Sequence, residues 1–186
     1  MRGPVTLTTR SLILRPFRSA DAPSVRALAG QWEVARMTDI IPHPYPEGVA
    51  EQWIATHDHK HAQGADHIFA ITRDDQCIGS IALESDIKKG ATGGTAVLGY
   101  WLGLPYWGQG FASEAVGAVI ALAFGKLDKP CLISDCFADN LASRRVLAKM
   151  GFIEGGHGTM QSVARGCEVP SVSLALTRDD WRAKQV

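Results

Sequence analysis

One stretch of this chain, residues 98–115, restricts the fold more than any other. Its first part, 98–102, is an apolar and aromatic run typical of a β-strand, and a turn containing Gly108 and Gly110 follows. An alanine-rich run then begins at Ala112 and has the composition of a helix that packs against a sheet. Several backbone N–H groups must therefore converge at one helix N-terminus, where anions bind readily. The sequence predicts an anion-binding cradle in this turn.

The length and composition indicate one ordinary domain over residues 1–186. With 46% hydrophobic residues, the chain can bury a substantial core without disulfides or a structural metal. Lys plus Arg and Asp plus Glu both number 19, so no overall field attracts nucleic acid or an anionic membrane. The N-terminus lacks an apolar signal core, and no segment approaches the ~20 apolar residues of a membrane span. We therefore expect a cytoplasmic protein with no direct nucleic-acid or membrane partner.

The cysteines are expected to be reduced thiols. There are four of them, without paired CxxC spacing or the density of a secreted scaffold, at positions Cys77, Cys131, Cys136 and Cys167. Cys131 and Cys136 lie five residues apart in a strand-like run, so they should point to opposite faces of a sheet and should not form a disulfide. Both are predicted to be small core residues.

The hydrophobic pattern predicts a mixed α/β (α+β) fold. The predicted strands are 12–15, 68–72, 77–83, 98–102, 132–137, Phe152-Ile153 and 169–176, with a polar hairpin turn at 73–76. The predicted helices are one capped by Ser19, then 47–62, 112–124, 139–151 and a short one after Thr177. Because the strands 98–102 and 132–137 are joined by a helix, they should form a parallel pair in an otherwise mostly antiparallel sheet.

The turn at 107–112 has the chemistry of a diphosphate site. Consecutive N–H groups and the positive end of a helix favour such an anion. The turn lacks the Lys-Ser/Thr of a triphosphate loop, and its spacing differs from the dinucleotide GxGxxG, so amides alone would hold the phosphates. From the turn alone, glycines that merely end a strand and begin a helix are an equal alternative.

Read together with Asn140, Ser143 and the Gly151-Phe152 pair, the chain resembles the GNAT superfamily of acyl-coenzyme A N-acyltransferases. The Arg/Gln-x-x-Gly-x-Gly/Ala turn of that family is matched here, except that Trp107 stands in its first position. The set of motifs is most similar to the RimJ/RimL branch, the N-terminal acetyltransferases of ribosomal proteins and their relatives. The resemblance extends over nearly the whole chain.

The resemblance implies a single GNAT-like domain whose helix-flanked sheet opens where two parallel strands splay around acetyl-CoA, with no metal. It places the diphosphate on the turn Trp107, Gly108, Gln109, Gly110, Phe111 and Ala112. The pantetheine arm would pair with the strand edge at Tyr100, Trp101 and Leu102 and contact Asn140 and Ser143. Asn140 also suits the simpler role of a helix cap.

The implied reaction is direct attack of a primary amine on the acetyl thioester, without a covalent enzyme intermediate. Leu147 occupies the place of the tyrosine that serves many GNAT enzymes as proton donor, so Ser143 is the expected group beside the sulfur. Glu84 is the expected proton acceptor, with Asp86 and Asp135 as weaker candidates. The alternatives are an ordinary helix hydroxyl at Ser143 and a surface charge at Glu84.

The resemblance implies the N-terminal α-amine of a protein, such as a ribosomal protein, as the leading acceptor. A small-molecule amine, namely an antibiotic, polyamine or amino acid, is the rival within the same chemistry. A non-catalytic acyl-CoA sensor and a nucleotide-binding module are rivals from other classes. The sequence leaves open whether the chain acts as a monomer or as a homodimer.

Three histidines and one glutamate outside the predicted site have structural interpretations. His57, His59 and His61 lie on one predicted helix, but only the first and last share a face, so a solvated helix end is favoured over a metal site. Glu114 lies in the first turn of the helix after the glycines, where a carboxylate complements the helix dipole.

Overall fold

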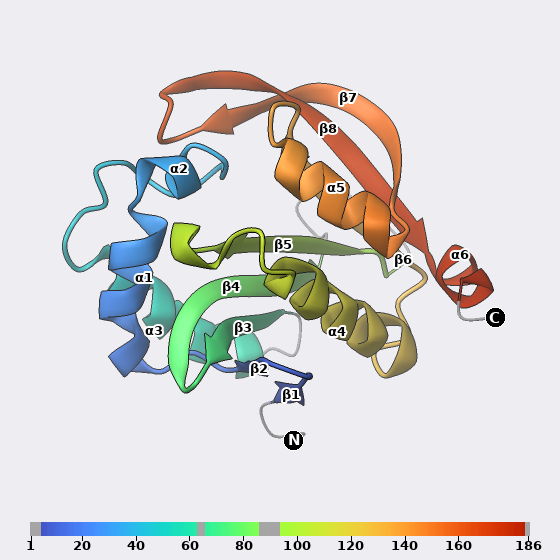
Figure 1. Ribbon diagram of the computed structural model, residues 1–186, viewed down its shortest axis with the longest axis horizontal. Coiled ribbons are helices and arrows are strands. Elements are labelled where there is room, and N and C mark those ends of the chain that lie inside the picture. The colour runs from blue at the N-terminus through green and yellow to red at the C-terminus, as the bar shows by residue number, and fades with distance from the viewer. Residues whose placement is uncertain (1–4, 63–65, 86–93, 185–186) are drawn as a thin grey trace.

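The computed structural model describes residues 5–62, 66–85 and 94–184, excluding the side chains of 58–62 and 85. They form an eight-stranded sheet in the order β1-β2-β3-β4-β5-β6-β8-β7 (Figure 1). The strands are β1 (Leu7–Thr8), β2 (Ile13–Arg15), β3 (His67–Arg73), β4 (Gln76–Ser85), β5 (Ala96–Leu102), β6 (Cys131–Phe137), β7 (Ile153–Ser162) and β8 (Cys167–Thr177). The helices are α1 (Ala22–Ala29), α2 (Trp32–Ala35), α3 (Val49–Ala62), α4 (Phe111–Gly125), α5 (Leu141–Met150) and α6 (Arg178–Ala183), with 3-10 turns η1 (Ser19–Asp21) and η3 (Leu104–Tyr106).

The sheet is mixed and mostly antiparallel, as predicted. Only β5 and β6 are paired in parallel, and the pairing is confined to Ala96 with Leu132 and Val97 with Ile133. Beyond these two pairs β5 stays with β4, while β6 continues along β8. The two parallel strands therefore diverge toward the carboxyl end of β5, where the glycine turn begins.

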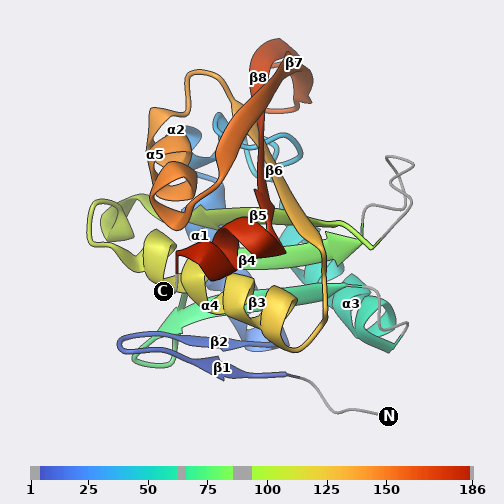
Figure 2. The same cartoon turned by 90° about the vertical axis from the view of Figure 1, so that its right-hand side faces the viewer.

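Helices cover both faces of the sheet (Figures 1 and 2). Helix α4 packs on one face through residues such as Val116 and Val119, in a core that includes Leu98 and Leu102 of β5. Helices α1 and α3 pack on the opposite face in a separate cluster, to which Trp101 adds its partly buried side chain. Because successive side chains of a strand alternate between faces, β5 contributes its even-numbered residues to one core and Trp101 to the other.

Several element boundaries differ from the sequence predictions. Ser19 does not cap a helix but begins η1, because Asp21 bends the chain there: its carboxylate accepts the Arg18 amide at 2.8 Å. The hairpin turn is shorter than predicted, since only Asp74 and Asp75 separate β3 from β4, with φ angles of 50° and 62°. Positive φ at both central residues is the geometry of a two-residue turn that matches the twist of the strands.

Strand β7 is much longer than the Phe152-Ile153 prediction. It carries Gly155, Gly156 and Gly158, has a register shift between Glu154 and Gly156, and is largely exposed. A strand with so little apolar alternation has no period-2 signal, and its pairing with β8 supplies the order instead. The short elements β1 and α2 were likewise not predicted.

The cysteines and histidines partly match their predictions. All four cysteines are free thiols, and Cys136 is buried as expected, whereas Cys131 at the start of β6 is only half-buried. The prediction of a solvated helix end is wrong for His57, which is 3% exposed and packs against the rings of Phe17 and Trp53 at centroid distances of 5.3 and 4.4 Å. The side chains of His59 and His61 lie outside the described residues.

No described helix has the length and apolarity needed to cross a membrane. The described residues also contain no group of three His, Cys, Asp or Glu side chains arranged to hold a metal ion.

Candidate active site

The glycine turn exposes its backbone to an approaching ligand. Gly108 and Gly110 have φ angles of 73° and 87°, in the left-handed region that favours glycine. A Cβ atom built at either position would have no heavy atom within 4 Å, so the space beside this backbone is open. The two glycines therefore satisfy a backbone requirement and also leave room for a ligand.

The turn leads directly into the N-terminus of α4. Gly110 is its N-cap and has no side chain to bond the first amides, and the first backbone bond of the helix joins the Glu114 N–H to the Gly110 carbonyl at 3.0 Å. The amides of Phe111, Ala112 and Ser113 precede that bond, at the end of the helix where anions are stabilised. Gln109 turns its side chain back, donating from Nε2 to the Pro105 carbonyl at 2.8 Å. This cradle fits a diphosphate held by amides.

The edge of β5 that faces the diverging β6 is defined by hydrogen-bond alternation. The Gly103 amide donates to the Ile78 carbonyl of β4 at 2.9 Å. Backbone groups of alternate residues point to opposite edges of an antiparallel strand. Gly99 and Trp101 therefore also bond toward β4, and the backbone of Tyr100 points toward the gap between the parallel strands.

Side chains donate hydrogen bonds to the backbone carbonyls at both ends of this β5 edge. At the start of the divergence, Ser134 Oγ donates to the Leu98 carbonyl at 2.8 Å. At the far end, the indole Nε1 of Trp107 donates to the Leu102 carbonyl at 2.7 Å. Between these two bonded carbonyls lies the backbone of Tyr100, whose amide and carbonyl fit the peptide-like amides of a pantetheine arm.

The geometry corrects the predicted contribution of Trp101 to that edge. Its backbone belongs to the β4 side, and a Cβ atom built on Gly79 would lie 2.3 Å from the Trp101 carbonyl oxygen. Its side chain packs into the cluster of α1 and α3. Trp101 therefore contributes neither backbone nor side chain to the gap, because alternation along the strand turns both away.

Three side chains, those of Tyr100, Ser143 and Cys136, meet beside the Asn140 cap of α5. Asn140 is the N-cap of α5, and its Oδ1 accepts the Ser143 amide at 3.1 Å, which confirms the capping interpretation. The Ser143 hydroxyl lies 2.9 Å from the phenol oxygen of Tyr100, which comes from β5 on the other side of the gap. Cys136 of β6 is the third member, because the Ser143 hydroxyl lies close enough to lower the pKa of its thiol.

Burial keeps two members of this group protonated at neutral pH. It raises the pKa of Tyr100 to about 12, although the Ser143 hydrogen bond acts in the opposite direction. It also raises the pKa of Cys136 to about 11, again partly offset by Ser143. Leu147, one turn further along α5, is fully buried in the core, so that position presents no polar group.

The structure does not bring Glu84 together with Ser143. Glu84 pairs with Val97 across β4 and β5, so it lies on the sheet face opposite Leu98 and Tyr100. Asp135 lies on the same face as Glu84, because Ile133, two residues earlier on β6, pairs with Val97. Both carboxylates thus flank the diverging strands from the α1 and α3 side. Asp86 lies outside the described residues.

The turn between β7 and β8 lies near the segment after α2 (Figure 1). Arg165 of this turn forms a clamp to that segment, which the sequence did not predict. Arg165 donates to both Asp139 oxygens at 2.9 and 3.1 Å, and its Nε donates to the Arg36 carbonyl at 2.7 Å. The Val163 amide also donates to the Asp39 carbonyl at 2.9 Å. Asp139 directly precedes Asn140, so the clamp is continuous with the cap of α5. No local sequence signal predicts these contacts, because they join segments far apart in the chain.

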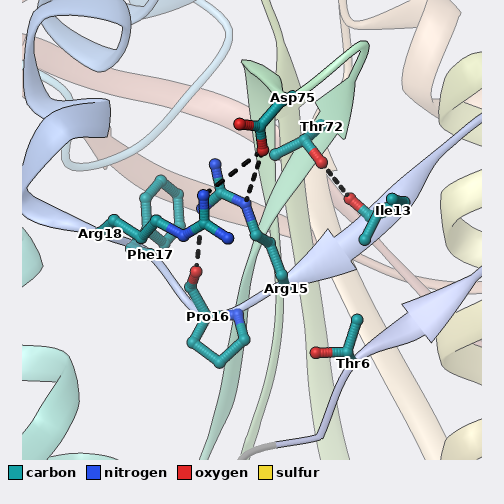
Figure 3. Close-up of a pocket in the computed structure, with 8 residues that line it drawn as sticks. All are labelled: Thr6, Ile13, Arg15, Pro16, Phe17, Arg18, Thr72 and Asp75. Carbon is teal, nitrogen blue, oxygen red and sulfur yellow. Dashed lines mark hydrogen bonds and ion pairs between the residues drawn. The ribbon is translucent and has the colours of Figure 1, made fainter.

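A pocket of about 340 Å³ lies elsewhere, at β2 and the β3–β4 turn (Figure 3). Asp75 lies there between two cations, 3.4 Å from Arg18 and 4.0 Å from Arg15 Nε. Arg15 also forms a buried ion pair with Asp21 at 2.8 Å. These charges are mutually compensated and hold the β3–β4 turn against β2 and η1, so we assign the pocket a structural role.

A glycine turn at the N-terminus of α4 thus lies beside a splayed parallel pair, an arrangement that suits a class of protein with an anionic ligand. Residues 11–153 match the acetyltransferase (GNAT) domain, and the chain therefore belongs to the GNAT acetyltransferase family. It is an acetyl-CoA-dependent N-acetyltransferase of the GNAT type.

Individual relatives agree with this family. The uncharacterized N-acetyltransferase YoaA of Bacillus subtilis is 31% identical over 152 residues, 81% of this chain and 84% of that protein. The ribosomal-protein-serine acetyltransferase of Escherichia coli is 32% identical over 98 residues, 52% of each. Among solved structures, the fold is similar to RimL, a ribosomal L7/L12 α-N-protein acetyltransferase in complex with coenzyme A, with 19% identity, a TM-score of 0.79, and coverage of 95% of this chain and 99% of that one.

Proposed function

We propose that this enzyme transfers the acetyl group of acetyl-CoA to the N-terminal α-amine of a protein, with a ribosomal protein as the leading acceptor. The observation that carries the proposal is the similarity to the Escherichia coli ribosomal-protein-serine acetyltransferase over about half of the chain. The name of that relative specifies an acceptor, which the shared fold alone does not.

The cofactor lies along the turn and the β5 edge in this proposal. The amides from Gln109 to Ala112 bind the diphosphate, and Trp107 and Gly108 shape the turn beside it. The backbone of Tyr100, and the amide of Leu102 on the same edge, pair with pantetheine. Asn140, already a helix cap, adds a side-chain contact. The support for this placement is the open space at Gly108 and Gly110 and the bonded carbonyls on either side of Tyr100.

The chemical step is direct transfer. The lone pair of the neutral amine attacks the thioester carbonyl carbon, and the C–N bond forms. The C–S bond breaks with its electron pair going to sulfur, and the second proton that the nitrogen loses passes to the thiolate, directly or through water, to give the coenzyme A thiol. Ser143 Oγ–H hydrogen-bonds the departing thiolate. Cys136 is a poor nucleophile for a covalent route because burial raises its pKa to about 11, which keeps it a thiol at neutral pH.

The protonated acceptor amine first loses a proton on the face of the sheet opposite Tyr100. Glu84 accepts it, directly or through a water molecule, and Asp135 is the alternative carboxylate on that face. The support is the position of Glu84 beside Val97, at the parallel pairs where β5 and β6 are still joined. An acceptor entering from the α1 and α3 side would meet the carboxylate before it meets the thioester.

A matched peptide panel tests the acceptor. Thiol release from acetyl-CoA is measured with a peptide that has a free N-terminus and no lysine, with the same peptide N-terminally blocked, and with a blocked peptide containing lysine. A polyamine, an aminoglycoside and free amino acids complete the panel. We expect turnover only with the free N-terminus, and mass spectrometry should locate the acetyl group on the α-amine.

The other outcomes separate the rivals. Faster turnover of a small amine than of every peptide would overturn the proposed acceptor and favour a small-molecule acetyltransferase. Tight binding of acetyl-CoA with no turnover on any amine would favour a sensor. A thermal shift produced by ATP or NAD, and abolished in competition with coenzyme A, would favour a nucleotide-binding module.

A further inference from the structure

The half-buried phenol of Tyr100 has a contact that the proposed reaction leaves unexplained. The ring comes from β5 and packs against the core beneath α4, where phenylalanine would pack equally well. Its hydroxyl instead crosses the gap between the parallel strands to Ser143 of α5. A tyrosine hydroxyl in a half-buried site usually has a hydrogen-bond partner. Here the partner is Ser143, the group expected beside the sulfur.

We propose that Tyr100 is a positioning residue for the transfer reaction: its O–H donates to Ser143 Oγ, which directs the Ser143 proton toward the departing sulfur. The inference rests on the proposed role of Ser143 and adds the Tyr100 hydroxyl as a hydrogen-bond donor to it. Tyr100 itself does not touch the reacting atoms and transfers no proton overall.

The geometry favours Tyr100 as the donor of this pair. The phenol oxygen lies 2.9 Å from Ser143 Oγ and 3.4 Å from the Ser143 carbonyl oxygen, which can only accept. The phenol proton therefore has two acceptors on the same residue. If Ser143 donated instead, its own proton would point into the protein, away from the gap in which the thioester is expected.

The surroundings also fix both oxygens in place. The Ser143 backbone is held by the Asn140 cap, and the Tyr100 backbone lies on the β5 edge between the bonded carbonyls of Leu98 and Leu102. The strand edge expected to hold pantetheine thus also sets the position of the phenol. Burial raises the pKa of Tyr100 to about 12, so it remains a donor throughout the usual assay range.

Kinetics of Tyr100→Phe, Ser143→Ala and the double variant test the coupling. We expect Tyr100→Phe to lower kcat about fivefold, the equivalent of one hydrogen bond, with the KM for acetyl-CoA within about twofold of the original. The double variant should be no slower than Ser143→Ala alone, because the phenol acts only through that hydroxyl. Multiplicative losses in the double variant would overturn the proposal, and so would an unchanged kcat in Tyr100→Phe. Thr72→Val, which removes a hydroxyl that bonds the Ile13 carbonyl between β3 and β2, is the control and should leave kcat unchanged.

A second readout needs no acceptor. The pKa of the coenzyme A thiol is measured in the binary complex from its thiolate absorbance. Tyr100→Phe and Ser143→Ala should each raise it, whereas site-specific 3-fluorotyrosine at position 100, a stronger donor of nearly the same shape, should lower it. No change in either direction would contradict the positioning role. If no amine is acetylated, the proposed function fails while this titration still decides the inference about Tyr100.

Discussion

At the scale of single residues, the site uses backbone and side chain for different purposes. Ser143 shows this most clearly: its amide completes the Asn140 cap, and its hydroxyl meets Tyr100. Sequence motifs pointed to Asn140 and Ser143 because they fall at fixed spacing on one helix. Tyr100 was singled out only for its backbone, since its side-chain contact depends on how far β5 and β6 diverge, and sequence does not encode that angle locally.

Gly110 gives the sharpest residue-scale prediction. Gly110→Ala places a Cβ at a φ of 87°, which costs about 1–2 kcal/mol of stability, and puts a methyl group in the space expected to receive the diphosphate. We expect the Kd for coenzyme A, measured by calorimetry, to rise at least about tenfold, the effect of losing 1.4 kcal/mol of binding energy. Gly125→Ala, at the opposite end of the same helix and also without close neighbours, is the control and should bind coenzyme A normally. Equal affinities in the two variants would place the diphosphate elsewhere.

At the scale of elements, Glu114 joins the loop between β1 and β2 to the first turn of α4. Its carboxylate accepts the Ser11 amide at 2.7 Å and the Ser11 and Thr9 hydroxyls at 2.6 Å each. Burial acts to raise the pKa of Glu114, but these hydrogen bonds outweigh it and hold the pKa below the ordinary value of 4.5. The dipole interpretation was therefore incomplete, because sequence alone did not show that the β1–β2 loop reaches this helix.

This contact predicts an acid-sensitive component of stability. Because the folded pKa lies below the unfolded one, the stabilisation is complete above about pH 4.5 and is lost as the pH falls through the folded pKa. Glu114→Gln should lower the free energy of unfolding by about 1–2 kcal/mol at pH 7. Below pH 4.5, the free energy of unfolding of this variant should depend less on pH than that of the original protein. Urea unfolding at a series of pH values measures both effects. Glu47→Gln, at an exposed carboxylate, should match the original protein, and a Glu114→Gln curve parallel to the original would refute the assignment.

The elements themselves were predicted from the sequence to different extents. Those with long apolar runs, such as α4 and β3 to β6, were predicted within a few residues, because their burial in the core agrees with their local composition. Strand β7 was largely missed because its glycines and exposed face carry no alternation. The burial of His57 was missed because α3 packs on a surface that only the tertiary fold supplies.

At the scale of the whole molecule, the Arg165 clamp ties the C-terminal hairpin to the N-terminal half. It lies next to Asp139, and thus to the start of α5, so it supports the site from the side where the parallel strands diverge. Sequence reasoning recovered the topology of the sheet, because a strand–helix–strand order dictates a parallel pair. It did not recover the clamp, because an arginine in a turn gives no sign of a partner 26 positions earlier.

Removal of this clamp should loosen the hairpin before it affects the sheet. The Arg165 guanidinium lies over the ring of Phe137. Arg165→Met keeps an apolar stem at this position and removes the hydrogen bonds to Asp139. We expect a loss of about 1–3 kcal/mol, together with faster hydrogen exchange at the Val163 amide, while amides of β5 keep their protection. Arg26→Met, at an exposed ion pair with Glu47, should change neither quantity. Uniformly faster exchange throughout the sheet would show that Arg165 supports global rather than local stability.

The central claim is that one continuous surface, from the N-terminus of α4 along β5 to Ser143, holds acetyl-CoA for transfer. A crystal structure of the enzyme with coenzyme A tests it most directly. The account predicts the diphosphate on the amides of Gln109 to Ala112, pantetheine paired with the Tyr100 backbone, and the sulfur within hydrogen-bond distance of Ser143 Oγ. A coenzyme A whose sulfur lies away from Ser143, or whose diphosphate leaves the turn empty, would contradict it.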